Sequence, residues 1–240
     1  MSILLLSNSS SSAGYLVHAH EWIAGALGDA RRVAFVPFAG VTLNWDEYAD
    51  RVEEALEPLG VQVTPVHRAE DAPAAVAAAD AVLVGGGNTF VLLRELYARG
   101  LVAAIRARVA AGAPFVGWSA GSNVACPTIR TTNDMPVVEP PSLDALGLVP
   151  FQINPHYTDR TIPGHGGESR ADRLAEFVVM NPGLPVVGLP EGTGLRVSDG
   201  RVERLGPHAV TLFRHGADPR VEDAIDLSRW LADSANQQVS

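Results

Sequence analysis

The sequence predicts an α/β protein: a mostly parallel sheet with helices on both faces and a small C-terminal antiparallel hairpin sheet. One observation is a series of short, continuous apolar runs, which are typical of strands buried on both faces. Another is that segments with helical spacing separate these runs throughout the first half of the chain. Strands that alternate with helices pair in parallel through right-handed crossovers, so the helices cover both faces of the sheet.

The first half of the chain supplies the alternating elements. The strands are predicted from apolar runs, at residues 2–7, 33–36, 61–66, 81–84 and 115–118. The helices are predicted from periodic or alanine-rich segments, at residues 15–27, 45–56, 73–79, 90–97 and 101–110. Pro73 suits the first turn of its helix, and Gly112 and Pro114 terminate the last one.

The alternation breaks in the second half. Residues 126–150 contain five prolines, which predicts long active-site loops with at most a short hairpin. Further strands are expected at 151–154 and 186–189, a helix at 170–179 capped by Ser169, and a hairpin at 195–202 that shares its small sheet with a strand at 209–213. We expect one domain over residues 1–232 and a disordered tail over 233–240.

Composition excludes several classes of protein. The 240 residues carry a formal net charge of −9, so no basic surplus is available to neutralise a nucleic-acid backbone. A single cysteine, Cys126, permits no intrachain disulfide and is expected to lie in the core. No apolar segment reaches the ~18 residues of a membrane span, and residues 1–6 lack a basic leader. We therefore expect a cytoplasmic protein that binds neither membranes nor nucleic acids.

The stretch Gly117-Trp-Ser-Ala-Gly121 has the pattern of a nucleophile elbow. In such a turn between a strand and a helix, the serine is exposed in a strained conformation beside backbone N–H groups that can bind an oxyanion. Because two glycines and a serine often coincide by chance, this pattern depends on its context. It predicts Ser119 as a nucleophile.

A serine nucleophile needs a base, and the sequence holds seven histidines. His156 closely follows a predicted strand, so it should lie on the same rim of the sheet as Ser119. His165 lies in a loop and is a weaker candidate for contact with substrate. The remaining histidines are expected to be structural.

The base in turn needs a carboxylate that orients it, and two residues compete for this role. Glu191 follows a predicted strand, between Pro190 and Gly192. Asp134 lies in the polar loop after the elbow, where it could equally stabilise a turn. Placement favours Glu191 as the orienting group and Asp134 as a residue that supports the site or contacts substrate.

The turn Gly85-Gly86-Gly87-Asn88 follows another strand. It lacks the spacing of a dinucleotide-binding fingerprint, so it is either a plain tight turn or a source of oxyanion donors. In the second case Gly87 and Ala120 would supply the two N–H groups, and Asn88 would contact substrate. Arg170 opens a helix, where a positive charge is unfavourable, so it is a candidate for binding a substrate carboxylate.

Taken together, these stretches resemble the peptidase E family of α-aspartyl dipeptidases. The motifs that carry the resemblance run in order from Ile3 to Val197. They are Leu4-Leu-Leu-Ser-Asn8, Phe35-Val-Pro-Phe-Ala-Gly-Val41, Trp45-Asp-Glu-Tyr48, Val84-Gly-Gly-Gly-Asn-Thr-Phe90, Gly117-Trp-Ser-Ala-Gly121, Cys126-Pro-Thr-Ile-Arg-Thr-Thr-Asn-Asp-Met-Pro136, Gln152-Ile-Asn-Pro-His156 and Gly188-Leu-Pro-Glu-Gly192.

The resemblance implies a fold like that of class I glutamine amidotransferases, with a flavodoxin-like core. It implies hydrolysis of dipeptides with an N-terminal aspartate, without a metal or cofactor. Whether the protein is a monomer or a homodimer stays open. It makes Ser119 the nucleophile, His156 the base, and Arg170 the residue that binds the aspartyl side chain. It leaves Glu191 and Asp134 both open as the third member. Ser122 departs from the alanine expected in this family.

Two alternative functions stay open at this point. One is a serine hydrolase of another aspartyl compound, such as a cyanophycin-like or isoaspartyl peptide. The other is a small-molecule binding protein of the same fold with a catalytically silent elbow.

Overall fold

The buried strands of the large sheet contribute to two separate cores. In β1 (Ser2–Leu6), Ile3 and Leu5 belong to one core and Leu4 and Leu6 to the other, because successive side chains of a strand point to opposite faces. All four are fully buried in the computed structural model, which describes residues 2–160, 164 and 166–231. A strand of this kind must be covered on both faces.

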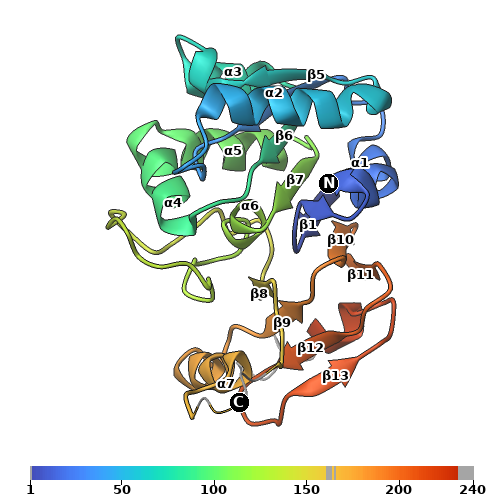
Figure 1. The fold of residues 1–240 in the computed structure, drawn as a ribbon, viewed down its shortest axis with the longest axis vertical. Helices are drawn as coiled ribbons and strands as arrows, with labels where there is room; N and C mark the ends of the chain where they lie inside the picture. Colours follow the sequence, from blue (N-terminus) through green and yellow to red (C-terminus); the bar gives the residue numbers. More distant parts are fainter. Residues whose placement is uncertain (1, 161–163, 165, 232–240) are drawn as a thin grey trace.

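Helices cover the two faces as the alternating pattern predicts (Figure 1). On one face lie α1 (His20–Leu27) and α2 (Trp45–Leu56), whose buried residues pack in the core that contains Leu4 and Leu6. On the other lie α3 (Ala72–Ala78), α4 (Thr89–Ala98) and α5 (Leu101–Ala110). Short 3₁₀ turns occur at Val17–Ala19, Glu57–Leu59 and Val66–Arg68.

The large sheet has the strand order β11-β10-β1-β7-β6-β4-β5. Its parallel strands besides β1 are β7 (Phe115–Trp118), β6 (Ala81–Val84), β4 (Arg32–Val36) and β5 (Gln62–Pro65). The hairpin of β10 (Gly194–Ser198) and β11 (Arg201–Leu205) is antiparallel and joins the edge of this sheet beside β1.

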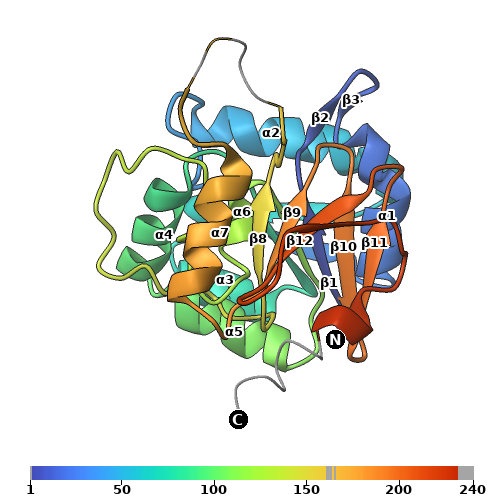
Figure 2. The same ribbon diagram turned by 90° about the horizontal axis from the view of Figure 1, so that it is seen from below.

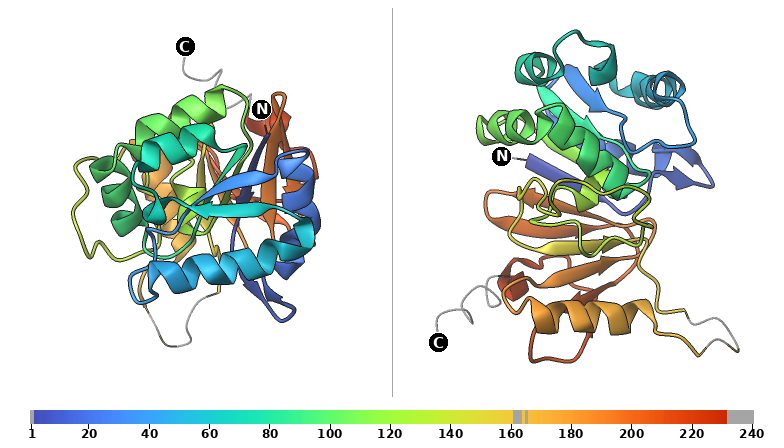
Figure 3. Two further views of the ribbon diagram at one scale, coloured as in Figure 1. Left: turned by 90° about the horizontal axis from the view of Figure 1, so that it is seen from above. Right: turned by 90° about the vertical axis from the view of Figure 1, so that its left-hand side faces the viewer.

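A second sheet has the order β13-β12-β9-β8. Its strands are β8 (Gln152–Pro155), β9 (Val186–Leu189), β12 (Val210–Phe213) and β13 (Arg220–Glu222); β8 and β9 are parallel, and the other pairs are antiparallel. Leu189 and Leu212 contribute to the core under the large sheet, whereas Val186 and Phe213 pack against α7 (Arg170–Met180). The second sheet therefore lies between the main body and α7 (Figures 2 and 3).

The predicted fold class is confirmed: a large, mostly parallel sheet with helices on both faces and a separate small sheet. The prediction that the hairpin at 195–202 and the strand at 209–213 share one small sheet is wrong. The hairpin at 195–202 pairs with β1 in the large sheet, while the strand predicted at 209–213 pairs with β9. Backbone hydrogen bonds between strands decide this pairing, and they leave no local sequence pattern.

The first predicted helix also begins later than expected. Residues 15–19 are not α-helical: β2 (Ser10–Ser11) and β3 (Gly14–Tyr15) form a tiny hairpin, and α1 begins only at His20. Leu16, counted in the helical pattern, has a positive φ of 58° and is buried. Its apolar side chain contributes to the core without a helix.

The long proline-rich segment links the large sheet to the second one. It contains one isolated antiparallel bridge, between Thr128 and Asp144, as the prediction of at most a short hairpin requires.

No helix of the described residues is long and apolar enough to cross a membrane. The tail predicted for residues 233–240 lies outside the described residues, and the single domain over 1–232 stays a prediction.

Candidate active site

Ser119 lies between β7 and the short helix α6 (Ala120–Asn123), with φ 53° and ψ −115°. Both glycines of the motif are required by close backbone approaches. A Cβ on Gly117 would lie 2.5 Å from the Gly121 carbonyl oxygen, and one on Gly121 would lie 2.0 Å from that of Val84. The turn is therefore the strained strand–turn–helix that a nucleophile elbow needs.

Ser122, which departs from the expected alanine, has a structural contact in this turn. Its buried hydroxyl lies 2.7 Å from the carbonyl oxygen of Gly117 and 2.8 Å from that of Leu6. These contacts tie α6 to the ends of β1 and β7. The Ser122 hydroxyl thus reinforces the turn.

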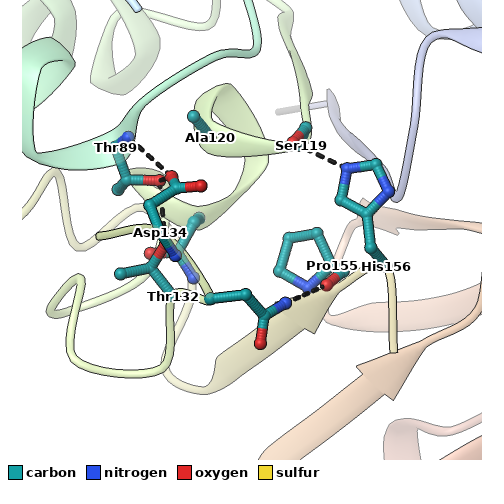
Figure 4. Close-up of a pocket in the computed structure, with 9 residues that line it drawn as sticks. Thr89, Ser119, Ala120, Thr132, Asp134, Pro155 and His156 are labelled. Carbon is teal, nitrogen blue, oxygen red and sulfur yellow. Dashed lines mark hydrogen bonds between the residues drawn. The ribbon is translucent and has the colours of Figure 1, made fainter. Parts of the chain in front are cut away.

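His156 directly follows β8 and also has a positive φ, of 54°. Its backbone N–H donates to the Ser7 hydroxyl at 2.9 Å, which anchors the turn to the end of β1. The ring Nε2 lies 2.9 Å from Ser119 Oγ (Figure 4). The other ring nitrogen, Nδ1, lies 2.7 Å from Glu191 Oε1.

Glu191 follows β9, the parallel neighbour of β8, so the two strands bring it and His156 to the same edge. The next residue, Gly192, has φ 76°, and its N–H donates to Asn8 Oδ1 at 2.8 Å. The Glu191 side chain is 66% exposed. Solvent therefore reaches the carboxylate that contacts the histidine.

Asp134 lines a cavity with Ser119 and His156, but its carboxylate hydrogen-bonds Thr89 and not the histidine ring. Its Oδ2 accepts from the Thr89 N–H at 2.7 Å and from the Thr89 hydroxyl at 2.6 Å, at the start of α4. Figure 4 shows this carboxylate beside Thr89 and away from the His156 ring. Of the two competing carboxylates, only Glu191 hydrogen-bonds His156 in the structure.

Gly87 is in a loop that only glycine can form. It has φ 141°, and a Cβ would lie 2.1 Å from the Ala39 carbonyl oxygen. Gly87 and Ser119 both line a cavity of about 450 Å³. Ala120 is the first residue of α6, so its N–H has no carbonyl one turn earlier to donate to.

Tyr48 supports this loop, although its position in the sequence predicts only a core residue on the apolar face of α2. Its buried hydroxyl donates to the Gly86 carbonyl at 3.1 Å and accepts from Trp118 Nε1 at 2.9 Å. Burial raises the pKa of Tyr48 well above its usual range, so the hydroxyl stays protonated and remains a donor. The sequence feature that could have indicated this role is a tyrosine on an otherwise apolar helix face, because a buried hydroxyl needs hydrogen-bond partners.

Arg170 begins α7 and is half-buried beside His156. Its guanidinium donates to the His156 carbonyl and lines a second cavity of about 590 Å³ together with His156 and Glu191. Burial lowers the pKa of Arg170, and the nearby Arg173 adds to this effect. A partly desolvated guanidinium of this kind favours an anionic partner.

Asn88 lines the same cavity as Gly87 and Ser119, but its side chain already has protein partners. Asn88 uses its side-chain oxygen to cap α4, accepting from the Phe90 and Val91 N–H groups, and its amide donates to the Met135 carbonyl. Cys126 is buried, which raises the pKa of its thiol to about 12. His165 lies outside the described residues.

The chain is similar to known peptidases over most of its length. The model of peptidase family S51 matches residues 3–205. Peptidase E of Salmonella newport is 51% identical over 219 residues, which cover 91% of this chain and 96% of that protein. Peptidase E of Salmonella gallinarum is 49% identical over 97% of both chains. A crystal structure of a peptidase from an acI-B1 Actinobacterium has the same fold, with a TM-score of 0.68 and 16% identity over 93% of this chain and 94% of that one. The family match and these identities show that the chain belongs to peptidase family S51.

Proposed function

We propose that this protein is a serine dipeptidase that hydrolyses the peptide bond after an N-terminal aspartate. The observation that carries the proposal is the hydrogen-bonded series from Ser119 through His156 to Glu191, at 2.9 and 2.7 Å. The identity of about half to proteins named peptidase E, over nearly the whole chain, supports the same activity. No observation favours a cyanophycin-like substrate or a silent site.

In the first half of the reaction, Ser119 Oγ attacks the carbonyl carbon of the aspartyl residue while His156 Nε2 takes the hydroxyl proton. Glu191 holds the Nδ1–H and stabilises the imidazolium that forms. The Gly87 and Ala120 N–H groups donate to the oxyanion. Nε2 then gives its proton to the leaving nitrogen as the peptide bond breaks.

The second half releases the aspartyl group from its ester with Ser119. Water attacks the ester carbonyl and gives a proton to His156, and the proton returns to Ser119 when the ester bond breaks. Free aspartate leaves, and the enzyme is restored. Because every proton passes through Nε2, the reaction depends on a single histidine.

Arg170 provides selection by charge. Its guanidinium is half-buried and carries a lowered pKa, so a substrate carboxylate beside it would recover the interactions that burial removes. A neutral side chain would leave the cation unpaired. An aspartyl side chain is therefore favoured over alanyl.

The test is hydrolysis of Asp-Leu and aspartyl p-nitroanilide, compared with the alanyl and glutamyl analogues. We expect release of aspartate, much slower cleavage of the analogues, and a loss of kcat of about 10⁴-fold or more in Ser119→Ala. Full activity in that variant would refute the mechanism. Equal rates on aspartyl and alanyl compounds would refute the specificity.

A further inference from the structure

The cavity that Gly87 and Ser119 line contains an arginine, Arg51, in its wall. Among the described residues that line this space of about 450 Å³, Arg51 is the only lysine or arginine, and none is an aspartate or glutamate. The chain as a whole has a formal net charge of −9. A cation in the wall of a cavity without acidic side chains, in an acidic protein, favours an anionic ligand there.

Arg51 reaches this cavity from the face of α2 that also contacts the oxyanion loop. It follows Tyr48 by three residues, so the two side chains lie on the same helix face. The Tyr48 hydroxyl on that face contacts the Gly86 carbonyl. The guanidinium carbon of Arg51 lies 5.8 Å from the centre of the Tyr15 ring, which lines the same cavity. Tyr15 belongs to β3, and Figure 2 shows the β2–β3 hairpin beside α2.

The Arg51 guanidinium has no carboxylate partner in the described part of the chain. Its nearest acidic neighbours in sequence, Asp50 and Glu53, pair with Arg68 instead, at 2.9 and 3.8 Å. A guanidinium carries five N–H donors, and their fixed arrangement matches the two oxygens of a carboxylate. These donors are therefore available to a ligand in the cavity.

The leaving residue is the part of the substrate that fits this cavity. Arg170 lines the cavity of about 590 Å³, where the proposed function places the aspartyl side chain, and Arg51 does not line that cavity. His156, whose Nε2 gives its proton to the leaving nitrogen, lines both cavities. We propose that the cavity of about 450 Å³ binds the leaving residue of the dipeptide, and that Arg51 binds its terminal carboxylate. The proposal rests on the proposed function, because it concerns the same substrate.

The covalent geometry of a dipeptide agrees with a cation in this position. In the leaving residue the carboxylate carbon lies two bonds, or about 2.5 Å, from the nitrogen that accepts the proton. The carboxylate therefore stays within the cavity that borders Ser119 and His156. A tripeptide would place a neutral amide at this point and move its carboxylate about 3.5 Å further along. Arg51 therefore favours dipeptides over longer peptides.

Two exposed apolar side chains line the same cavity. Val41 and Val137 are each 60% exposed, and both lie in loops. An apolar side chain on the leaving residue would remove part of this surface from water, which is favourable. We therefore expect leucine to be preferred to glycine as the leaving residue.

The experiment compares Asp-Leu with Asp-Leu amide, which differs only in its neutral C-terminus. We expect the wild type to prefer the free acid in kcat/KM about 10-fold, the low end for a hydrogen bond to a charged group, because Arg51 is exposed. This preference should be largely lost in Arg51→Gln and largely kept in Arg51→Lys. Raised salt should reduce the wild-type preference, since exposed charges are screened.

Aspartyl p-nitroanilide is the reference substrate, because its leaving group has no carboxylate. Arg51→Gln should lower the ratio of kcat/KM for Asp-Leu to that for the anilide about 10-fold. A variant that merely folds poorly would lower both values together and leave the ratio unchanged. Arg229→Gln is the matched control, since Arg229 is an exposed arginine that does not line the cavity. It should leave the ratio as in the wild type.

Asp-Gly tests the apolar part of the wall. We expect its kcat/KM to be about fivefold below that of Asp-Leu, as for partial burial of a leucine side chain. The difference should shrink in Val137→Ser, which makes the wall more polar without changing its charge.

Three results would overturn the proposal. Equal wild-type kcat/KM on Asp-Leu and its amide would mean that Arg51 binds no carboxylate. Equal losses on Asp-Leu, its amide and the anilide in Arg51→Gln would mean that Arg51 only supports the wall beside Tyr15. Equal wild-type kcat/KM on Asp-Leu and Asp-Gly would mean that the leaving side chain does not contact the valines. Failure of the proposed function is a different result, in which the wild type cleaves none of these compounds.

Discussion

The Tyr48 hydroxyl lies 3.1 Å from the Gly86 carbonyl oxygen, and this contact sets the direction of the following N–H. The C=O of Gly86 and the N–H of Gly87 belong to one planar trans peptide, so they point in opposite directions. A donor that holds the carbonyl on the α2 side therefore directs the N–H of Gly87 to the other side of the loop. Tyr48 is thus a positioning residue for the proposed oxyanion site.

Tyr48→Phe should lower kcat about 10-fold with little change in KM, because the peptide loses its anchor while the donor itself remains. Loss of a donor would cost more, about 10²–10³-fold. Tyr15→Phe is the control: it removes a hydrogen bond to the same hydroxyl, at 3.3 Å, without releasing Gly86. Steady-state kinetics on an aspartyl anilide measures kcat and KM for both variants. An unchanged kcat in Tyr48→Phe, or an equal fall in Tyr15→Phe, would contradict the positioning role.

Glu191→Gln should lower kcat on an aspartyl anilide about 10²-fold or more, because the imidazolium of His156 loses its carboxylate partner. Asp134→Asn should cause a smaller loss of kcat, because the Asp134 carboxylate accepts hydrogen bonds from Thr89 and none from His156. The exposed Glu176 on α7 offers a control, and Glu176→Gln should have no effect on kcat. If Asp134→Asn gave the deeper loss of kcat, Asp134 would be the orienting group.

Gly87→Ala should reduce both activity and stability. A Cβ at this position would lie 2.1 Å from the Ala39 carbonyl oxygen at a φ of 141°, so the loop must move. We expect kcat/KM to fall by about 10²-fold or more, as for a lost oxyanion donor. Gly25→Ala in α1 is the control, since its Cβ would have no neighbour within 4 Å and alanine favours a helix. Kinetics and thermal unfolding of both variants test this; wild-type activity in Gly87→Ala would exclude Gly87 as a donor.

Asp80 should make stability depend on pH at the acidic end. Hydrogen bonds from the Arg32 side chain, and from the Arg32 and Arg31 N–H groups, lower the pKa of Asp80 to about 2. A carboxyl with a lowered pKa in the folded state stabilises it above the pKa of the unfolded chain, and this contribution is lost as the pH falls towards about 2. Asp80→Asn should therefore lower Tm at pH 7, and the difference should shrink below about pH 4.

Thermal unfolding of wild type and Asp80→Asn between pH 7 and pH 2.5 measures this effect. Asp218→Asn, at an exposed position, controls for the change in net charge. A difference in Tm that stayed constant over this range would show that the Asp80 charge contributes nothing and that only the shape of the side chain matters.

Most of the secondary structure could be predicted from the sequence because its causes are local. Strands buried on both faces need continuous apolar runs, and β4 and β6 agree with their predicted positions to within a residue. α5 covers the predicted residues, and the predicted cap at Ser169 is present as a capping box. The nucleophile elbow could also be predicted, because its turn requires glycine at two positions. Backbone atoms lie so close to Gly117 and Gly121 that neither position has room for a Cβ.

What the sequence by itself determined was the fold class, the family and the residues available to a serine-type site. Only the tertiary structure decided which carboxylate hydrogen-bonds His156, because Glu191 and Asp134 both follow plausible local patterns and only the pairing of β8 with β9 brings one of them within 2.7 Å. It also decided that the C-terminal hairpin joins β1. Distances between segments far apart in the chain depend on packing and strand register, and neither leaves a local pattern.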